Sequence, residues 1–334
     1  MSRKMFPLST FSQTVIDAQV DQASDKIVAG FAKCAIRLDA AIPPVRVIRA
    51  QDPIAMKPAK VRLGDYQDSN GQWYVRKPDG TSAECYPLGC SGAMQDSNGF
   101  WYTVAPFPAD DTWLQTEGFG GQLDRHGVVI VTSWDGVPLQ AWETWEAWRD
   151  AASGQWKASM VVCFNPLAGD MQRPWNWSSA NAFGGSIASY VLTYAEAVRP
   201  IQHAVGITIA PAHNLPYWCL PAACCLEGSP QNPPPTGLLG HGRRLRLRAD
   251  FDLRPFSPVA RNVLVALQDY GAIIVDQGAD LMVTVDTDKR WSLPSTPGGK
   301  SVAQEIAAGV TSSDLEVLAM PANCGPFNYQ NFPK

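Results

Sequence analysis

An eight-residue motif that occurs twice limits how the first third of this chain can fold. Residues 67–74 read QDSNGQWY and residues 95–102 read QDSNGFWY, so seven of eight positions match at a spacing of 28 residues. In each copy an Asn-Gly pair, suited to the positive φ angles of a type I′ turn, precedes aromatic strand formers. The motif therefore predicts two copies of one β-hairpin. Because two copies are too few for an independent repeat domain, we expect the pair to pack on a larger domain.

The duplicated hairpin has two interpretations. In the first, it is a structural unit that was copied and binds nothing. In the second, Trp73 and Trp101 are matching aromatic contacts for a sugar or another repeated ligand.

Residues 106–334 carry mostly strand patterns. A three-stranded meander is predicted from Val128–Trp134, Leu139–Trp148 and the run that ends at Phe164, with Asp135-Gly136 as its first turn. Counts of 12 Trp, 27 Gly and 27 Pro in 334 residues also favour a turn-rich β architecture. The further predicted strands are Ile187–Tyr194, Ile201–Ala210, Tyr217–Ala222, Arg243–Leu253, Ala272–Asp276 and Leu281–Asp286. We therefore expect a mainly β protein built as a two-sheet, jelly-roll-like β-sandwich.

One helix is predicted to cover a sheet of this sandwich. Ser257 is its expected N-cap, Pro258 lies in its first turn and Gly271 ends it. Apolar residues at helical spacing between these signals indicate a structural role.

The amino-terminal 60 residues are expected to form a helical arm or adaptor. Residues 21–36 are amphipathic, and prolines after them interrupt regular structure. The segment is too small to hold its own core, so we expect it to pack on a partner or on a second copy of the chain. The predicted organisation is thus an arm at 1–60, a hairpin module at 61–105 and a sandwich at 106–334.

Composition opposes two classes of partner. A net charge of −4 and a charged fraction of 17% argue against nucleic acid, because phosphate binding needs a basic surface. No run approaches the roughly 18 apolar residues of a membrane helix, so no membrane insertion is expected. Polar residues also interrupt the apolar core that a secretory signal would need, and we expect no such signal. The interrupting residues are Gln13, Asp17, Gln19 and Asp21.

Eight cysteines without a Cys-x-x-Cys pair predict scattered, reduced and mostly buried thiols. Cys85 and Cys90 bracket a short loop and are close enough in sequence to form a bridge. The four histidines lack the spacing of a zinc site, so neither metal nor cofactor is expected. They are His126, His203, His213 and His241.

Three residues form a candidate acid–base group. His203 lies on the apolar face of a predicted strand, where a hydrogen-bonded core histidine is the commoner outcome. In the alternative, Glu196, His203 and His126 converge as a catalytic group.

Two further sets of side chains are candidate ligand contacts. Residues 243–253 alternate strictly, and their polar face includes Arg246 and Asp250. This face is either a solvated outer surface or the floor of a cleft that binds sugar hydroxyls or uronate carboxylates. Nine of the 12 tryptophans lie between Trp101 and Trp177, and an exposed subset that includes Trp175 and Trp177 would stack on sugar rings.

Several short motifs follow one another between Asp124 and Trp291. They are Asp124-Arg125-His126, Trp177-Ser178-Ser179-Ala180, Gln202-His203-Ala204, Arg244-Leu245-Arg246-Leu247-Arg248 and Phe256-Ser257-Pro258, the last of which opens a helix that runs into Tyr-Gly, a strand and Asp276. Over this range, about half of the chain, the sequence resembles a largely uncharacterised group of secreted β-sandwich proteins of soil bacteria, and the helix with Tyr-Gly, strand and Asp276 is the most specific part. The resemblance implies a jelly-roll-like sandwich that binds or acts on polysaccharide. Members also carry a signal peptide and a histidine where this chain has Cys224 and Cys225.

Three hypotheses about function follow. The first is a carbohydrate-binding or surface-attachment protein, as an accessory component of a phage virion, with a glycan, other virion proteins or a second copy of the chain as partners. The second is an extracellular glycoside hydrolase or polysaccharide lyase. The third is a purely structural capsid or tail protein without a ligand.

Overall fold

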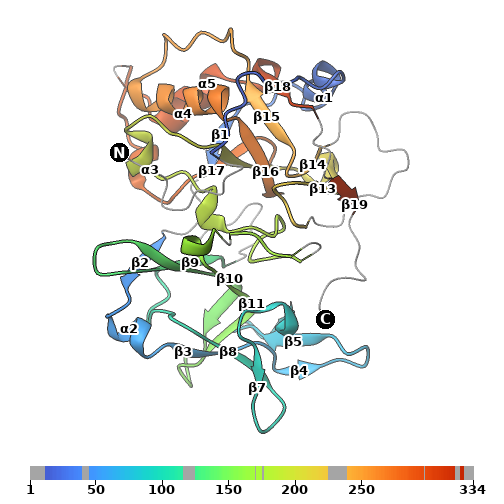
Figure 1. The fold of residues 1–334 in the computed structure, drawn as a ribbon, viewed down its shortest axis with the longest axis vertical. Helices are drawn as coiled ribbons and strands as arrows, with labels where there is room; N and C mark the ends of the chain where they lie inside the picture. Colours follow the sequence, from blue (N-terminus) through green and yellow to red (C-terminus); the bar gives the residue numbers. More distant parts are fainter. Residues whose placement is uncertain are drawn as a thin grey trace. The chain divides into compact units, whose positions relative to one another are not determined.

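The computed structural model describes most of the chain: residues 12–39, 45–115, 125–169, 171–174, 177–224, 239–296, 298–319 and 324–326. The protein is mainly β and divides into two compact units (Figure 1). Unit 1 comprises residues 1–42 and 189–327, and unit 2 comprises residues 43–188 and 328–334. The units do not coincide with the three segments expected from sequence, because residues 1–60 are divided between them. Trp175 and the Pro-rich stretch at 230–235 lie outside the described residues.

Unit 1 is built on a mixed six-stranded sheet in the order β1-β17-β12-β16-β15-β18. Its strands are β1 (Arg37–Asp39), β12 (Val205–Ile209), β15 (Arg244–Leu247), β16 (Ala272–Gln277), β17 (Met282–Thr284) and β18 (Leu315–Val317). The helices of the unit are α1 (Ser24–Gly30), α3 (Tyr194–Ala197), α4 (Pro258–Asp269) and α5 (Val302–Gly309). One continuous apolar cluster includes buried residues from the strands and from all four helices.

The predicted covering helix is confirmed as α4, but it is not the only helix on this core. α5 follows Ser301, whose hydroxyl accepts from the Gln304 backbone N–H in a capping box. Ser257 occupies the N-cap position of α4 without capping it through its own side chain. Instead, its hydroxyl and its backbone N–H both donate to the carboxylate of Glu305.

The described part of the amino-terminal arm packs on its own chain. α1 is shorter than the predicted helix at 21–36, because Ala32 and Lys33 adopt left-handed backbone conformations that end it. β1 then pairs with β17, and Ser24 accepts from the backbone N–H of Val317. The segment at 12–39 therefore contributes Ile27, Val28, Phe31 and Ile36 to the core of unit 1.

A small sheet in unit 1 carries the disulfide. It joins β13 (Asn214–Cys219), β14 (Leu239–His241) and β19 (Cys324–Pro326), and Cys219 forms a disulfide with Cys324. This pair, 105 residues apart, was not predicted. The expected candidates Cys85 and Cys90 are instead buried free thiols.

Unit 2 is built on a seven-stranded sheet in the order β2-β9-β10-β11-β3-β8-β7. Its strands are β2 (Arg46–Arg49), β3 (Ala59–Arg62), β7 (Met94–Gln95), β8 (Trp101–Ala105), β9 (Gly127–Thr132), β10 (Pro138–Arg149) and β11 (Trp156–Phe164). The short helix α2 (Pro53–Met56) connects β2 to β3, and the predicted meander is confirmed as β9-β10-β11. The two largest sheets belong to different units, and the two-sheet sandwich stays a prediction.

Both copies of the repeat form hairpins with the same register. The first hairpin is β4 (Tyr66–Gln67) with β5 (Trp73–Arg76), which also pairs with β6 (Ser82–Cys85), and the second is β7 with β8. The prediction of a type I′ turn is wrong, because that turn needs positive φ angles at both of its central residues. Gly71 and Gly99 have positive φ angles, but Asn70 and Asn98 do not. Each turn is a three-residue loop that ends in glycine. In each, the aspartate side chain accepts two backbone N–H groups: Asp68 from residues 70 and 72, and Asp96 from residues 98 and 100.

Several predicted strands have different boundaries or a different conformation; for example, the strand expected at 217–222 is β13 at Asn214–Cys219. The expected strand at 243–253 is a strand only as β15, because the Phe251 N–H donates to the carbonyl of Arg248 and turns the chain. The strand expected at 187–194 is a 3-10 turn at Ile187–Ser189 followed by α3 at Tyr194. The strand expected at 201–210 begins only at Val205.

No helix in the described part of the chain has the length and hydrophobicity to cross a membrane.

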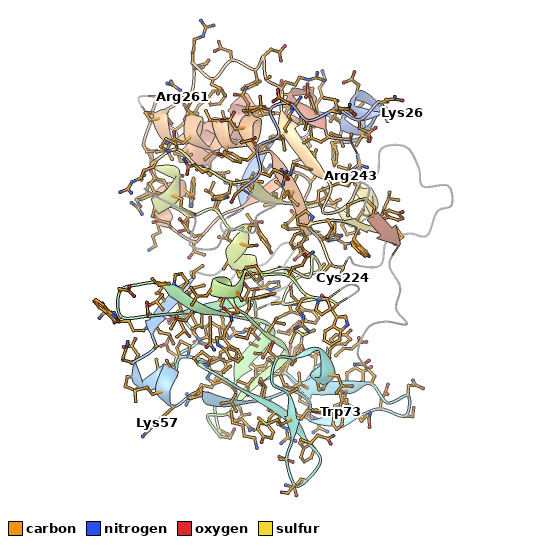
Figure 2. The ribbon with its side chains drawn as sticks, in the orientation of Figure 1. Lys26, Lys57, Trp73, Cys224, Arg243 and Arg261 are labelled. Atoms are coloured by element: carbon orange, nitrogen blue, oxygen red, sulfur yellow. A yellow bond between two sulfur atoms is a disulfide. The ribbon has the colours of Figure 1, made fainter. Side chains whose placement is uncertain are left out.

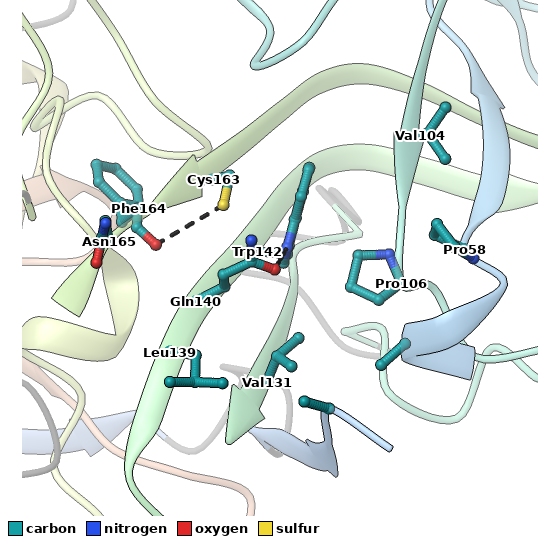
Figure 3. Close-up of a pocket in the computed structure, with 12 residues that line it drawn as sticks. Pro58, Val104, Pro106, Val131, Leu139, Gln140, Trp142, Cys163, Phe164 and Asn165 are labelled. Atoms are coloured by element: carbon teal, nitrogen blue, oxygen red, sulfur yellow. Dashed lines mark hydrogen bonds between the residues drawn. The ribbon is translucent and has the colours of Figure 1, made fainter. Parts of the chain in front are cut away.

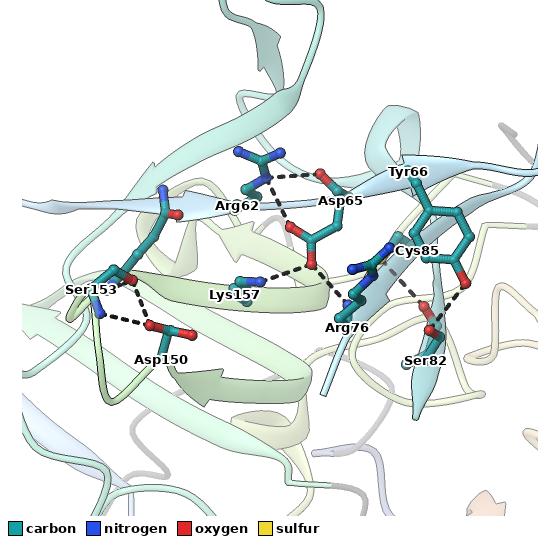
Figure 4. Close-up of polar contacts among 12 residues, drawn as sticks. Arg62, Asp65, Tyr66, Arg76, Ser82, Cys85, Asp150, Ser153 and Lys157 are labelled. Carbon is teal, nitrogen blue, oxygen red and sulfur yellow. Dashed lines mark hydrogen bonds and ion pairs between the residues drawn. The ribbon is translucent and has the colours of Figure 1, made fainter. Parts of the chain in front are cut away.

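Asp65 links the first hairpin to the seven-stranded sheet (Figure 4). Its carboxylate lies 3.1 Å from Arg62 Nε on β3 and 2.8 Å from Lys157 Nζ on β11. It also accepts from the Arg76 backbone N–H on β5 at 2.9 Å. All three ionic side chains are largely buried, so loss of this carboxylate would leave two cations without their common partner.

We predict that Asp65→Ala lowers the free energy of unfolding by about 3 kcal/mol, measured by urea denaturation. Asp250→Ala is the matched control, since Asp250 is exposed, and it should change stability by less than about 0.5 kcal/mol. Equal effects of the two substitutions would contradict the assigned role of Asp65.

Removal of the disulfide by Cys219→Ala with Cys324→Ala should lower the free energy of unfolding by about 4 kcal/mol. The reason is that it releases a closed loop of 105 residues in the unfolded chain. A reducing agent should destabilise the wild-type protein to a similar extent and leave the double variant unchanged. Reductant sensitivity of the double variant would contradict the assignment.

Candidate functional site

Unit 2 contains an open groove with a volume of about 640 Å³ (Figure 3). Most of the residues that line it are apolar, and none of them is charged. The lining residues are Ala50, Ala55, Pro58, Val104, Pro106, Val131, Leu139, Gln140, Trp142, Cys163, Phe164 and Asn165.

The adjacent strands β9, β10 and β11, together with β8 and the α2 region, build the groove. β8, β9, β10 and β11 each contribute side chains, and the segment around α2 supplies Ala50, Ala55 and Pro58. The register of β10 against β9 shifts between Pro138 and Gln140. A bulge of this kind re-aims side chains, which explains why the consecutive residues Leu139 and Gln140 both line the groove.

Trp142 is held in place from within the same strand. Its indole Nε1–H donates to Gln140 Oε1 at 3.0 Å, and the indole is half-buried. Because an indole nitrogen only donates, this contact identifies the oxygen of the Gln140 amide and directs its NH₂ group elsewhere. The result is a fixed aromatic side chain beside an amide donor.

Asn165 is the second amide of the groove. Its Oδ1 accepts from the backbone N–H of Ala168 at 3.2 Å and caps the 3-10 turn Pro166–Ala168. The two side-chain amides therefore already use their oxygens as acceptors, and both have an NH₂ group that can donate to a ligand.

Glu143, the neighbour of Trp142 on β10, is fully buried. It accepts from the Ser186 hydroxyl, from the Ile187 N–H at 2.9 Å and from the Ala188 N–H at 3.1 Å. Burial raises the pKa of Glu143 to about 7, against the three hydrogen bonds, which lower it. Successive side chains of a strand alternate between faces, so this carboxylate anchors residues 186–188 away from the groove.

The structure brings two of the three expected acid–base residues together. His203 Nε2 lies 3.7 Å from Glu196 Oε1 in unit 1, a distance longer than a hydrogen bond. The other oxygen of Glu196 accepts from the N–H and hydroxyl of Thr193 in the capping box of α3. His203 is only 2% exposed, and its Nδ1 donates to the Ala204 carbonyl. His126 is buried in unit 2.

The Arg246 side chain is occupied by its own chain. Its guanidinium donates to Glu316 on β18 and to the carbonyls of Val15 and Ile16 from the amino-terminal segment. Arg243, labelled in Figure 2, binds Asp21 of the same segment. Asp250 is exposed and lies beyond the end of β15. Arg246 of β15 and Arg243, just before it, therefore hold the arm instead of lining a groove.

The tryptophans that the structure describes fall into three groups. Buried indoles form part of the core, and in unit 2 Trp113 and Trp156 contact each other and Phe107. Trp134, at the tip of the β9–β10 hairpin, is 76% exposed. The half-buried group contains Trp73, Trp101, Trp142, Trp145 and Trp177.

Trp73 and Trp177 already have partners. Trp73 (Figure 2) packs against the buried cluster of Val75, Ala83, Cys85 and Trp148. Trp177 lies under the guanidinium of Arg173, 4.9 Å from its ring centroid.

The groove was not predicted from the sequence. The cluster of tryptophans between Trp101 and Trp177 indicated this part of the chain, but it did not show which indole lines a groove. The bulge at Leu139 and the contribution of the α2 region, more than 80 residues earlier, have no recognisable signal in the sequence.

The described residues contain no cluster of three or more His, Cys, Asp or Glu side chains suited to a metal ion. No protein-family model matches the chain, and neither a curated protein nor a solved structure matches it.

The raised pKa of Glu143 predicts a pH-dependent contribution to stability. Between pH 4.5 and about 7 the folded protein holds a proton on Glu143 that the unfolded chain releases. The stabilisation of the folded protein by Glu143 is therefore fully present below pH 4.5 and is lost as the pH rises through about 7. The total loss in the free energy of unfolding is about 3 kcal/mol.

The test compares wild type with Glu143→Gln, which keeps the shape of the side chain and cannot titrate. The stability of wild type relative to this variant should fall over that pH range in urea unfolding experiments and level off above it. A difference between the two proteins that is independent of pH would contradict the pKa assignment.

Proposed function

We propose that this protein is a non-catalytic carbohydrate-binding protein that attaches to a surface glycan, and that the groove of unit 2 binds the sugar. The observation that carries the proposal is the fixed, half-buried indole of Trp142 in an uncharged groove. A sugar ring has an apolar face that stacks on an indole and polar edges that pair with amides. Trp142, Gln140 and Asn165 supply these two kinds of contact.

In this proposal the repeated hairpins support the groove. The second hairpin includes β8, whose Val104 lines the groove and pairs with Lys60 of β3. Trp73 packs the first hairpin against the buried cluster that includes Trp148 of β10. For this reason we assign the sugar contact to Trp142 in place of Trp73. Trp101 is not among the residues that line the groove.

The proposed location is outside the cytoplasm of a cell, on a virion or in the extracellular space. The disulfide between Cys219 and Cys324 supports it, because disulfides persist mainly in oxidising environments. The resemblance to secreted sandwich proteins is consistent with the same location.

A glycoside hydrolase or lyase is the second candidate, favoured by the approach of His203 to Glu196. We rank it lower because His203 is buried and Glu196 caps α3. A general acid or base must reach the proton that it transfers. A structural capsid or tail protein without a ligand is the third candidate.

The test is a glycan array with wild type, Trp142→Ala and Trp134→Ala. Trp142→Ala should weaken binding by about tenfold or more, through loss of the stacking surface. Trp134→Ala is the matched control, since it removes an exposed indole outside the groove, and it should bind like wild type. If wild type binds no glycan, or if Trp142→Ala binds as tightly as wild type, the proposal is wrong.

A further inference from the structure

The groove carries three chemical features that together narrow its ligand. The first is charge. All twelve lining residues are uncharged, so a carboxylate or sulfate in the groove would lose its hydration without gaining a cation. The groove therefore favours a neutral sugar and disfavours the uronates that an arginine-lined cleft would select.

The second feature is an excess of hydrogen-bond donors. Gln140 Oε1 accepts from Trp142, and Asn165 Oδ1 accepts from Ala168, so both amides offer the ligand their NH₂ groups. The thiol of Cys163 lies 3.7 Å from the Phe164 carbonyl and is directed at its own backbone. A ligand that presents a strong acceptor, such as a carbonyl oxygen, matches these amides better than one that presents only hydroxyl groups.

The third feature is the extent of apolar wall. Eight of the twelve lining residues are alanine, proline, valine, leucine or phenylalanine. A fully hydroxylated hexose would place hydroxyls against these walls without partners, at a cost for each. A methyl group on the ligand would instead gain from burial there.

From these features we infer that the groove recognises the acetamido group of a neutral N-acetylhexosamine. The carbonyl oxygen of the acetamido group accepts from the amides of Gln140 and Asn165. Its methyl group lies on the apolar wall, and the sugar ring stacks on Trp142. This inference rests on the proposed function and specifies its ligand class.

The experiment measures binding of the full-length protein by isothermal titration calorimetry to four matched sets of oligosaccharides. They contain N-acetylhexosamines, the corresponding hexoses, 6-deoxyhexoses and uronic acids. The N-acetylated set should bind at least about tenfold more tightly than the hexose set. Its affinity should change by less than about twofold between roughly 50 mM and 500 mM salt, because no ion pair forms. The uronic acid set should bind most weakly.

Two substitutions test the donors directly. Gln140→Glu and Asn165→Asp keep the oxygens that bind Trp142 and Ala168 but remove the NH₂ groups. Each should weaken binding of the N-acetylated set by about tenfold and reduce its advantage over the hexose set. Asn98→Asp is the matched control, because it makes the same change in an exposed hairpin turn, and it should bind like wild type.

The outcomes separate this inference from the proposed function. If hexoses or 6-deoxyhexoses bind as tightly as N-acetylated sugars and Trp142→Ala abolishes binding, the acetamido inference is wrong and the proposed function stands. Tightest binding of uronic acids would also overturn the inference. If none of the four sets binds to wild type, both the inference and the proposed function are wrong.

Discussion

The pairing of β10 with its neighbours on both sides is the constraint on which unit 2 depends. This single strand of 12 residues hydrogen-bonds to β9 and β11. Its side chains take part in three separate features of unit 2. Trp142 and Gln140 form the polar and aromatic part of the groove, Glu143 anchors residues 186–188, and Trp148 contacts the first hairpin. A change in its register by one residue would move every one of these side chains to the opposite face.

Short-range patterns in the sequence were reliable guides to this structure. The hairpins, the β9-β10-β11 meander and α4 are all encoded within a few residues, by turn residues, alternation or capping signals. Even so, the turn type of the hairpins was wrong, because Asp68 and Asp96 accept backbone N–H groups and stabilise a three-residue loop. The Arg-rich strand was predicted too long, since Phe251 and Leu253 pack on the core without continuing β15.

Long-range relations were not predictable from one sequence. The disulfide joins residues 105 positions apart, and β1 from the arm completes a sheet whose other strands begin after residue 200. The groove combines residues 50–58 with side chains from 104 to 165, and its chemistry depends on which donors are already used internally. The expected pair of Glu196 and His203 does form, but burial and capping, which sequence does not show, alter what it can do.

The two edge strands of the seven-stranded sheet determine how readily a strand of another molecule could pair with it. One edge is β7, only two residues long, and the other is β2, which exposes Arg46 and Arg49. Short or charged edge strands give an incoming strand little to pair with. The edges of the seven-stranded sheet thus disfavour the continuous intermolecular pairing of strands that leads to amyloid.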